Sequence, residues 1–303
     1  MVSLEQRGNS TPARRWREWI LFVLLIGPNL FLFAVFTYWP LIYNAYLSFV
    51  RWNFLRPVKP FVWFDNYISV FTSRLFWEIV LNTLVFAFWS VGLTLTLGLV
   101  LALLINQPLR FRNGARAVLF SPVVMSGAVV AVVWSYIFDP RYGLIDQLLG
   151  LMGLNSPDWL GTTRWAMPAV IIVYVWKNLG YAVVIYLAGL QGIPRELYDA
   201  ALVDGAGPWA RFRHVTLPGL SPVAFFLSVT SVLATFQAFD IIKVLTEGGP
   251  VNATTTLVFY LYELGFVTYD AGKAGVVAVT LFLIMLVLTL IQVRYLERRV
   301  SYG

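Results

Sequence analysis

Six apolar stretches, each about 20 residues or longer, constrain the fold of this chain more than any other feature. A helix rises about 1.5 Å per residue, so about 20 residues cover the roughly 30 Å hydrocarbon core of a bilayer. Because lipid cannot satisfy backbone polar groups, such stretches are expected to cross the membrane as helices. The sequence therefore predicts an all-α integral membrane protein with six transmembrane helices, over residues 19–38, 79–105, 117–138, 166–190, 219–245 and 274–293.

Local sequence features refine this prediction. Trp39-Pro40 is expected to end the first helix at the membrane interface, followed by an aromatic-rich loop over 40–77. Pro122 and Gly127 indicate a kink or a close helix contact within the third helix. A local ion pair would account for the two charged residues near the end of the fifth stretch, which are Asp240 and Lys243.

Composition excludes several other classes of protein. Hydrophobic residues make up 59% of the 303 residues and charged residues 12%, and the mean hydropathy is +0.74, which is not typical of a soluble domain. The net charge of +7 does not indicate a nucleic-acid partner, because the basic residues lie at the ends of apolar stretches, where they determine topology and contact lipid headgroups. The absence of cysteine and the single histidine leave no thiolate chemistry and little material for a metal site.

No motif for catalysis or ATP binding is present. The pattern GxxxxGK[ST] fails at Gly272-Lys273, where Val267 replaces the first glycine and Ala274 follows the lysine. HExxH, GxSxG and paired-cysteine spacings are also missing. We therefore expect a protein that is not an enzyme and that does not itself hydrolyse ATP by this route.

The distribution of basic residues predicts the orientation. Residues 1–18 form a polar tail with four arginines, and no small-residue cleavage site follows, so residues 19–38 are expected to remain as part of a single domain, 19–303. With the tail in the cytoplasm, 13 of the 22 Lys and Arg residues lie on the inner side and 8 in the longer outer loops. This bias follows the positive-inside rule and places both termini and the loop 192–218 in the cytoplasm.

The loop 192–218 has a local structure of its own. Pro194 opens a short run with a smooth alanine surface, and Gly205, Gly207 and Pro208 stop that run. The pattern predicts a short helix outside the bilayer, then a turn and a second amphipathic piece. This shape is suited to a cleft on another protein, and the alternative is an ordinary solvated loop.

The same loop resembles the EAA loop of binding-protein-dependent ABC importer permeases, whose pattern is EAA, three further residues, DGA and later LP. The matching residues here are Asp199-Ala200-Ala201, Asp204-Gly205-Ala206-Gly207 and Leu217-Pro218. Asp199 departs from the pattern, because the family usually has Glu there and Asp is one methylene shorter. The resemblance implies that a helical segment from Asp199 to Gly207 docks into a groove on an ATPase subunit.

Three further stretches resemble the sugar and glycerol-phosphate subgroup of these permeases: FDNYISVF (64–71), NTLVF (82–86) and FDIIKVLTEGGPVNATTTLVFYLYELGF (239–266). The resemblance implies the type I ABC importer permease fold in a bacterial cell membrane, surrounded by lipid. It also implies a second homologous permease, two ATPase subunits that bind ATP and Mg, and an extracytoplasmic solute-binding protein. No cofactor is expected in this chain.

The solute that the resemblance implies is sn-glycerol-3-phosphate or a glycerophosphodiester such as glycerophosphocholine. The alternative within the family is a neutral di- or oligosaccharide of the maltose or trehalose kind. An independent channel or ion-coupled carrier is a more distant alternative. Such a carrier normally buries more than one ionisable residue along its spans, and only Lys177 qualifies here.

Polar residues on the fourth and fifth helices are the candidates for the solute path. Those of the fourth helix share one face, and they are Tyr174, Lys177, Asn178 and Tyr181. Those of the fifth, where the family has substrate or gate contacts, are Ser228, Ser231 and Thr235. Lys177 is suited to a phosphate oxygen, but it can also extend to the outer interface or pair with an acid of the partner subunit. Helix packing explains the hydroxyl residues equally well, and Gln237 joins the path only if the fifth helix is unwound there.

Overall fold

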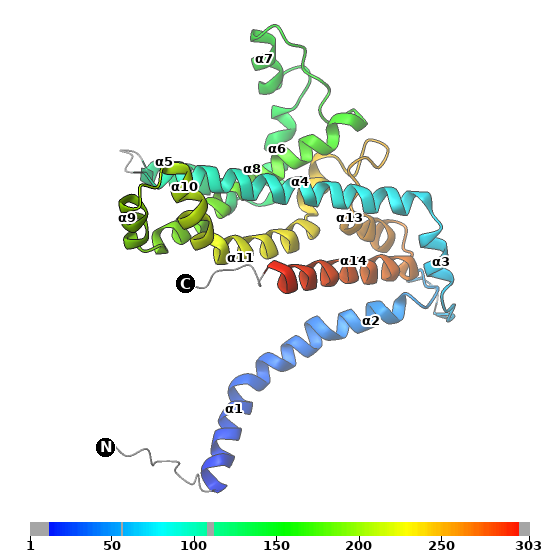
Figure 1. Ribbon diagram of the computed structural model, residues 1–303. Coiled ribbons are helices and arrows are strands. Elements are labelled where there is room, and N and C mark those ends of the chain that lie inside the picture. The colour runs from blue at the N-terminus through cyan, green and yellow to red at the C-terminus, as the bar shows by residue number, and fades with distance from the viewer. Residues whose placement is uncertain (1–11, 56, 108–111, 297–303) are drawn as a thin grey trace.

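The computed structural model describes residues 12–55, 57–107 and 112–296, and within them the chain is built from helices (Figure 1). Five helical segments are long and apolar enough to cross a membrane, and they are Trp19–Leu47, Arg74–Ile105, Thr163–Gly192, Pro208–Phe236 and Ala271–Arg294. A sixth crossing requires two helices that meet at 105° to count as one span. The all-α prediction is confirmed, and its six spans are five long helices and one broken pair. Residues 1–11 of the predicted tail and residues 297–303 lie outside the described residues.

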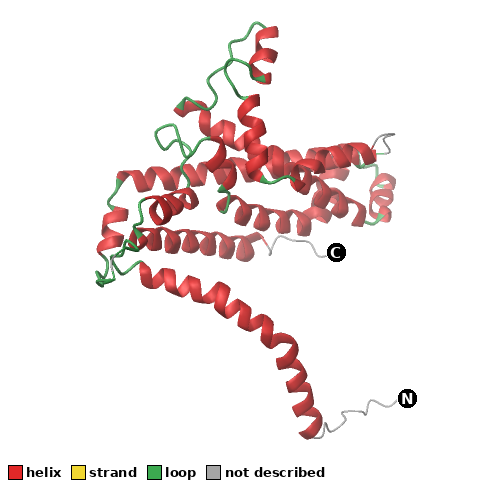
Figure 2. Ribbon diagram, turned by 180° about the vertical axis from the view of Figure 1, so that it is seen from behind, coloured by secondary structure: helices red, strands yellow, loops and turns green. Residues whose placement is uncertain are grey.

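The first span is longer than the sequence predicts. Its three segments are α1 (Pro12–Phe33), the π-helical turn η1 (Ala34–Tyr38) and α2 (Trp39–Leu47). The expectation that Trp39-Pro40 ends the helix is wrong, because Pro40 lies in the first turn of α2, directly after the wider π turn, where its missing N–H is tolerated. Both views show α1 leaning away from the other helices (Figures 1 and 2).

The connection over 40–77 is partly helical, which corrects the prediction of a loop. It contains the end of α2 and the helix α3 (Asp65–Phe71). The buried amide of Asn66 donates to the carbonyl oxygens of Ser48 and Val50, both at 2.9 Å. These bonds satisfy two backbone carbonyl groups that accept no hydrogen bond within a helix or sheet, so they hold the connection in one conformation.

The helices α4 (Arg74–Ile105) and α8 (Thr163–Gly192) form the centre of the bundle, and α8 is the more buried of the two. They confirm the predicted second and fourth spans, with each helix starting a few residues earlier. Two apolar clusters lie along them, one around Phe86, Val170 and Tyr174 and the other around Ala102, Ala182 and Leu190. Burial of these side chains is what positions the polar face of α8.

The predicted third span is not one helix. It consists of α5 (Arg112–Val124) and α6 (Gly127–Ile137), bent by 105°. Pro122 lacks the N–H that would continue the helix ladder, and the Ser126 hydroxyl accepts a hydrogen bond from the Val129 N–H at 3.3 Å, which starts a new helix. The predicted kink is therefore a break.

The predicted fifth span, 219–245, is wrong at both ends. The helix is continuous from Pro208 to Phe236 through α10 (Pro208–Arg211), η2 (Phe212–Thr216) and α11 (Leu217–Phe236). It ends at Gln237, and the separate helix α12 (Asp240–Leu245) turns to bury its apolar residues in a cluster shared with α6. Burial against α6 thus outweighs continuation of the helix.

The remaining helices complete the bundle. They are α7 (Leu144–Leu151), α9 (Arg195–Val203), α13 (Leu257–Tyr262), η3 (Glu263–Val267), α14 (Ala271–Ile291) and η4 (Gln292–Leu296). The helix α14 confirms the predicted sixth span. Figure 1 shows α9 and α10 at one end of the bundle and α3 at the opposite end.

Candidate functional site

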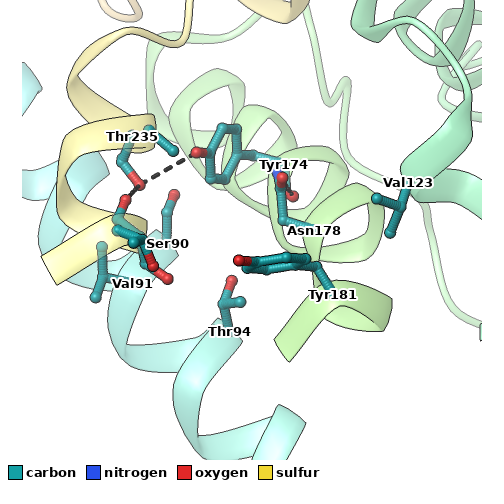
Figure 3. Close-up of a pocket in the computed structure, with 11 residues that line it drawn as sticks. Ser90, Val91, Thr94, Val123, Tyr174, Asn178, Tyr181 and Thr235 are labelled. Atoms are coloured by element: carbon teal, nitrogen blue, oxygen red, sulfur yellow. Dashed lines mark hydrogen bonds between the residues drawn. The ribbon is translucent and has the colours of Figure 1, made fainter. Parts of the chain in front are cut away.

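A pocket of about 320 Å³ lies among α4, α8 and α11, beside the end of α5 (Figure 3). Its lining residues are Ser90, Val91, Thr94, Val123, Tyr174, Asn178, Tyr181, Thr230, Ser231, Ala234 and Thr235. The polar members carry hydroxyl or amide groups, and none of the lining side chains is charged. The pocket can therefore hydrogen-bond a ligand and stack against it without offering a counter-ion.

Three hydrogen bonds order the polar side chains of α8 and α11 at the pocket. The Thr235 hydroxyl oxygen lies 3.3 Å from the Tyr174 hydroxyl oxygen and donates to the Ser231 carbonyl oxygen at 2.7 Å. The Asn178 amide donates to the Tyr174 carbonyl oxygen at 2.8 Å. The carbonyl oxygen of the Asn178 side chain and the Tyr181 hydroxyl make no hydrogen bond to the described residues, so both remain able to accept one.

The α4 wall carries two hydroxyls without a protein partner. Ser90 is 0% exposed and Thr94 is 4% exposed. In the part of the chain that the structure describes, neither hydroxyl makes a hydrogen bond. A buried hydroxyl that lacks a partner is destabilising, so this pair leaves unused hydrogen-bonding capacity on the α4 wall.

The pocket brings together five of the seven residues that the sequence suggests for a solute path: Tyr174, Asn178, Tyr181, Ser231 and Thr235. Ser228 is elsewhere: its hydroxyl donates to the Phe225 carbonyl, and its own carbonyl accepts from the Gln292 amide at 3.3 Å. The Ser228 backbone carbonyl therefore connects α11 to η4, while its hydroxyl bonds within its own helix.

Lys177 does not line the pocket. It is half-buried near the middle of α8, and no ion pair to it occurs among the described residues. About 14 residues separate it from either end of the helix, which is roughly 20 Å, more than a lysine side chain spans. This position does not fit extension to the outer interface.

The sequence interpretation missed six lining residues, namely Ser90, Val91, Thr94, Val123, Thr230 and Ala234. A signal for two of them was present, because Ser90 and Thr94 are four residues apart and share a face of the second apolar stretch. Val123 could not have been found, since it reaches the pocket only because the third span breaks beside it. Gln237 lies where α11 ends, and it is exposed and outside the pocket lining.

The break in the third span is held by a contact with α12. Gly127 begins α6, and a Cβ atom at this position would overlap the Asp240 carboxylate. Glycine is therefore required for the two helices to approach. The predicted Asp240–Lys243 ion pair is absent from the described residues. The Lys243 ammonium instead lies 5.3 Å from the ring centre of Tyr262. The electron-rich ring face attracts the cation there.

The segment that resembles the EAA loop is a short exposed helix and a turn. The helix α9 ends at Val203, so Asp204, Gly205, Ala206 and Gly207 form the turn, and the expectation of a helix through Gly207 is corrected. The Ala206 N–H donates to the Ala201 carbonyl and the Gly205 N–H to the Leu202 carbonyl, which is a Schellman termination. Gly205 has φ +76°, a conformation that favours glycine.

The surface of this segment combines charge with exposed apolar groups. Asp199, Ala200, Asp204, Gly205 and Gly207 are exposed, and Ala201 and Ala206 are half-buried. Exposed apolar residues lie beside them, and they are Leu197, Leu202, Val203 and Trp209. Such a mixed patch on a monomer is typical of a protein interface.

Comparison with known families decides the identity of the chain. The family described as binding-protein-dependent transport system inner membrane component matches residues 94–302. The chain belongs to this family. The matched region includes most of the pocket and the whole of α9, and the family resemblance read from the EAA-like loop is confirmed.

Similar proteins agree with this family. The chain is 36% identical to the trehalose/maltose transport system permease protein MalF of Thermococcus litoralis, over 94% of this chain and 97% of that protein. It is also 36% identical to the sn-glycerol-3-phosphate transport system permease protein UgpA of Pectobacterium atrosepticum, over 94% of this chain and 96% of that protein. A bacterial ABC transporter involved in the import of the acidic polysaccharide alginate has a chain of similar fold. Its TM-score is 0.81 at 26% identity, covering 93% of this chain and 96% of that chain.

These findings make the chain a permease subunit of an ABC importer, a non-catalytic component of the inner membrane with the type I importer permease fold. Family membership decides against the independent channel and the ion-coupled carrier. Among the described residues no group of three or more His, Asp or Glu could hold a metal ion. The chain thus combines a pocket among its spanning helices with an exposed segment, α9 and its turn, that resembles the EAA loop.

Proposed function

We propose that this permease forms half of the translocation path of a binding-protein-dependent importer, and that the pocket contacts the solute on its way through the membrane. The observation that carries the proposal is a cavity lined by hydroxyl and amide groups among apolar helices. Polar groups inside a membrane protein are retained where they line a path. The two unpartnered hydroxyls of α4 add support, because a passing solute would satisfy them.

The coupling half of the proposal concerns α9 and its turn. We place both termini and α9 in the cytoplasm, where one of two ATPase subunits docks on the exposed patch and supplies all chemistry that needs ATP and Mg. A second homologous permease completes the path, and an extracytoplasmic binding protein delivers the solute. The alginate transporter supports this arrangement, since one of its structures is described as a complex with an alginate pentasaccharide-bound periplasmic protein.

For the solute we favour a neutral polyhydroxylated compound, such as a di- or oligosaccharide, because the pocket lining has no charge. A sugar presents many hydroxyls to Ser, Thr, Asn and Tyr side chains, and its apolar faces can lie on tyrosine rings. A phosphate would have to leave water for a cavity that offers it no cation, which is strongly unfavourable. The MalF and UgpA relatives do not decide between the two, since both are 36% identical to this chain.

sn-Glycerol-3-phosphate or a glycerophosphodiester is the second candidate, and Lys177 is the observation in its favour. Lys177 follows the pocket residue Tyr174 by one helical turn, near the middle of α8. A shift of α8 or of its side chain would bring the ammonium to the cavity, where it could bind a phosphate oxygen.

Uptake by the complete importer in proteoliposomes separates the two candidates. We expect saturable uptake of labelled maltose or trehalose, and Lys177→Ala should leave it within about twofold of wild type. Uptake restricted to sn-glycerol-3-phosphate or glycerophosphocholine, and abolished by Lys177→Ala, would establish the second candidate instead. Failure of any ATPase subunit to co-purify with the wild-type chain would contradict the coupling role.

A further inference from the structure

One side-chain hydrogen bond joins α9, the helix proposed to dock on the ATPase subunit, to a spanning helix. The Tyr198 hydroxyl of α9 lies 3.0 Å from the Thr216 hydroxyl of η2. Tyr198 is half-buried and Thr216 is 5% exposed, so water competes little for the bond. Within residues 12–55, 57–107 and 112–296, no other side-chain hydrogen bond connects α9 to another helix.

The position of Thr216 gives this bond mechanical importance. Thr216 ends the π-helical segment η2, which lies inside the continuous helix Pro208–Phe236. A π turn is rare and occurs frequently at functional sites. The hydroxyl pair therefore holds α9 against a departure from regular α-helical geometry in that helix.

The same helix carries one wall of the pocket. Its lining residues, Thr230, Ser231, Ala234 and Thr235, follow Thr216 by 14 to 19 residues. At about 1.5 Å per residue the pocket wall lies roughly 20–30 Å along the helix from the bond. We expect a displacement applied at Thr216 to reach the pocket wall, because the helix continues without a break to Phe236.

An apolar contact on the other side of the segment keeps this connection in place. Ile193, which directly follows α8, is buried, and a Cβ atom at Gly219 would lie 2.9 Å from its Cδ1 atom. Gly219 is in the first turn of α11. The end of α8 is thus fixed to the start of α11, while Tyr198 alone connects α9 itself by a side-chain hydrogen bond.

We propose that the Tyr198–Thr216 hydroxyl pair is the positioning contact that passes motion of α9 to α11 and so to the solute pocket. The proposal rests on the coupling role of α9 given above. Neither residue touches the solute, and both act through the helix to which the bond connects. A contact that only anchors the loop would affect assembly and thermal stability, whereas a transmitting contact sets how much solute moves for each ATP hydrolysed.

The test measures solute uptake and ATP hydrolysis in the same proteoliposomes, made with the whole importer and its binding protein. Tyr198→Phe and Thr216→Val each remove one hydroxyl at almost constant size. We expect uptake per ATP to fall about three- to tenfold in each, the range for loss of one hydrogen bond. The double variant should be no worse than either single one, because both remove the same interaction.

Matched controls separate transmission from general damage. Thr216→Ser keeps the hydroxyl and should keep uptake per ATP. Tyr136→Phe, at a residue that is 75% exposed on α6, and Thr72→Val, at an exposed residue after α3, should also leave it unchanged. The ATPase subunits should co-purify with every variant in wild-type amounts.

Two results would overturn the proposal. One is uptake per ATP within about twofold of wild type in both single variants; the other is a double variant whose loss is the product of the two single losses. Failure of the coupling role itself is distinguishable. The chain has no cysteine, so a cysteine placed at Val203, which is 89% exposed, is a unique site for cross-linking to an ATPase subunit. A wild-type-like importer without that cross-link would contradict the docking of α9 and not only the hydroxyl pair.

Discussion

The helices α8 and α11 line part of the pocket, and the α9 turn lies between these two helices in the sequence. The two places present opposite kinds of surface. At the pocket, α8 and α11 contribute uncharged side chains that face a cavity. Beyond the end of α8 and before α11, the chain is charged, exposed and shaped by glycine. Under the proposed function, recognition depends on buried side-chain groups and coupling depends on backbone shape. Changes at one place should therefore leave the other function nearly intact.

The largest effect is expected for Gly205→Val. The backbone at Gly205 has φ +76°, which is strongly unfavourable for a β-branched residue and costs even an ordinary one about 1–2 kcal/mol. The turn would change shape, and uptake per ATP should fall by about tenfold or more. Gly192→Ala, in α8 and outside the turn, is the control, since an added Cβ there would meet nothing within 4 Å. Normal uptake by Gly205→Val in whole cells would show that coupling does not depend on the backbone shape of this turn.

A smaller effect is expected where α6 meets α12 beside the pocket. Gly127→Ala places a methyl group on the Asp240 carboxylate, and overpacking of this kind costs about 1–3 kcal/mol. The thermal midpoint in detergent should fall by a few degrees, and Gly127→Ala combined with Asp240→Ala should recover part of the loss. Gly92→Ala on α4, where a Cβ would meet nothing within 4 Å, should leave the midpoint unchanged or higher. Equal midpoints for the two alanine variants would show that the contact does not hold the break.

The smallest effect sharpens the comparison from the pocket side. Thr94→Val removes a hydroxyl that makes no hydrogen bond to the described residues, so the protein should be as stable as wild type or slightly more stable. The rate of solute uptake should nevertheless fall about three- to tenfold. The ratio of neutral sugar taken up to ATP hydrolysed should change little. Thr280→Val on α14 is the control, because that hydroxyl donates to the Val276 carbonyl within its own helix. A stability loss without an uptake loss would make Thr94 a packing residue.

The sequence predicts several of the pocket-lining residues, because helical spacing places residues on faces before any packing is known. Tyr174, Asn178 and Tyr181 were grouped by spacing alone, and they do line one cavity. Lys177 and Ser228 satisfied the same rule and yet lie outside it. A helical wheel predicts on which face of a helix a residue lies. How much of that face borders a cavity depends on the neighbouring helices.

The boundaries of the helices show the same limit. Apolar length predicted the spans correctly in number, if the broken pair is counted as one. It missed the break after Val124 and the end of α11 at Phe236, because an apolar run continues through both. Pro122 and the Ser126 cap favour the break locally, and the burial of α12 against α6, segments about 110 residues apart in the sequence, stabilises both interruptions.

The sequence by itself determined the membrane-spanning class, the family and the glycine-terminated helix of the coupling segment, because each depends on composition or on neighbours a few residues away. The tertiary structure alone decided which hydroxyls share the pocket, that Val123 and α4 belong to it, and that Tyr198 reaches Thr216. The physical reason is that a cavity and a contact between helices are properties of packing. Local preferences determine which side chains lie on each face of a helix. Only the packing of segments distant in the sequence determines which groups those side chains contact.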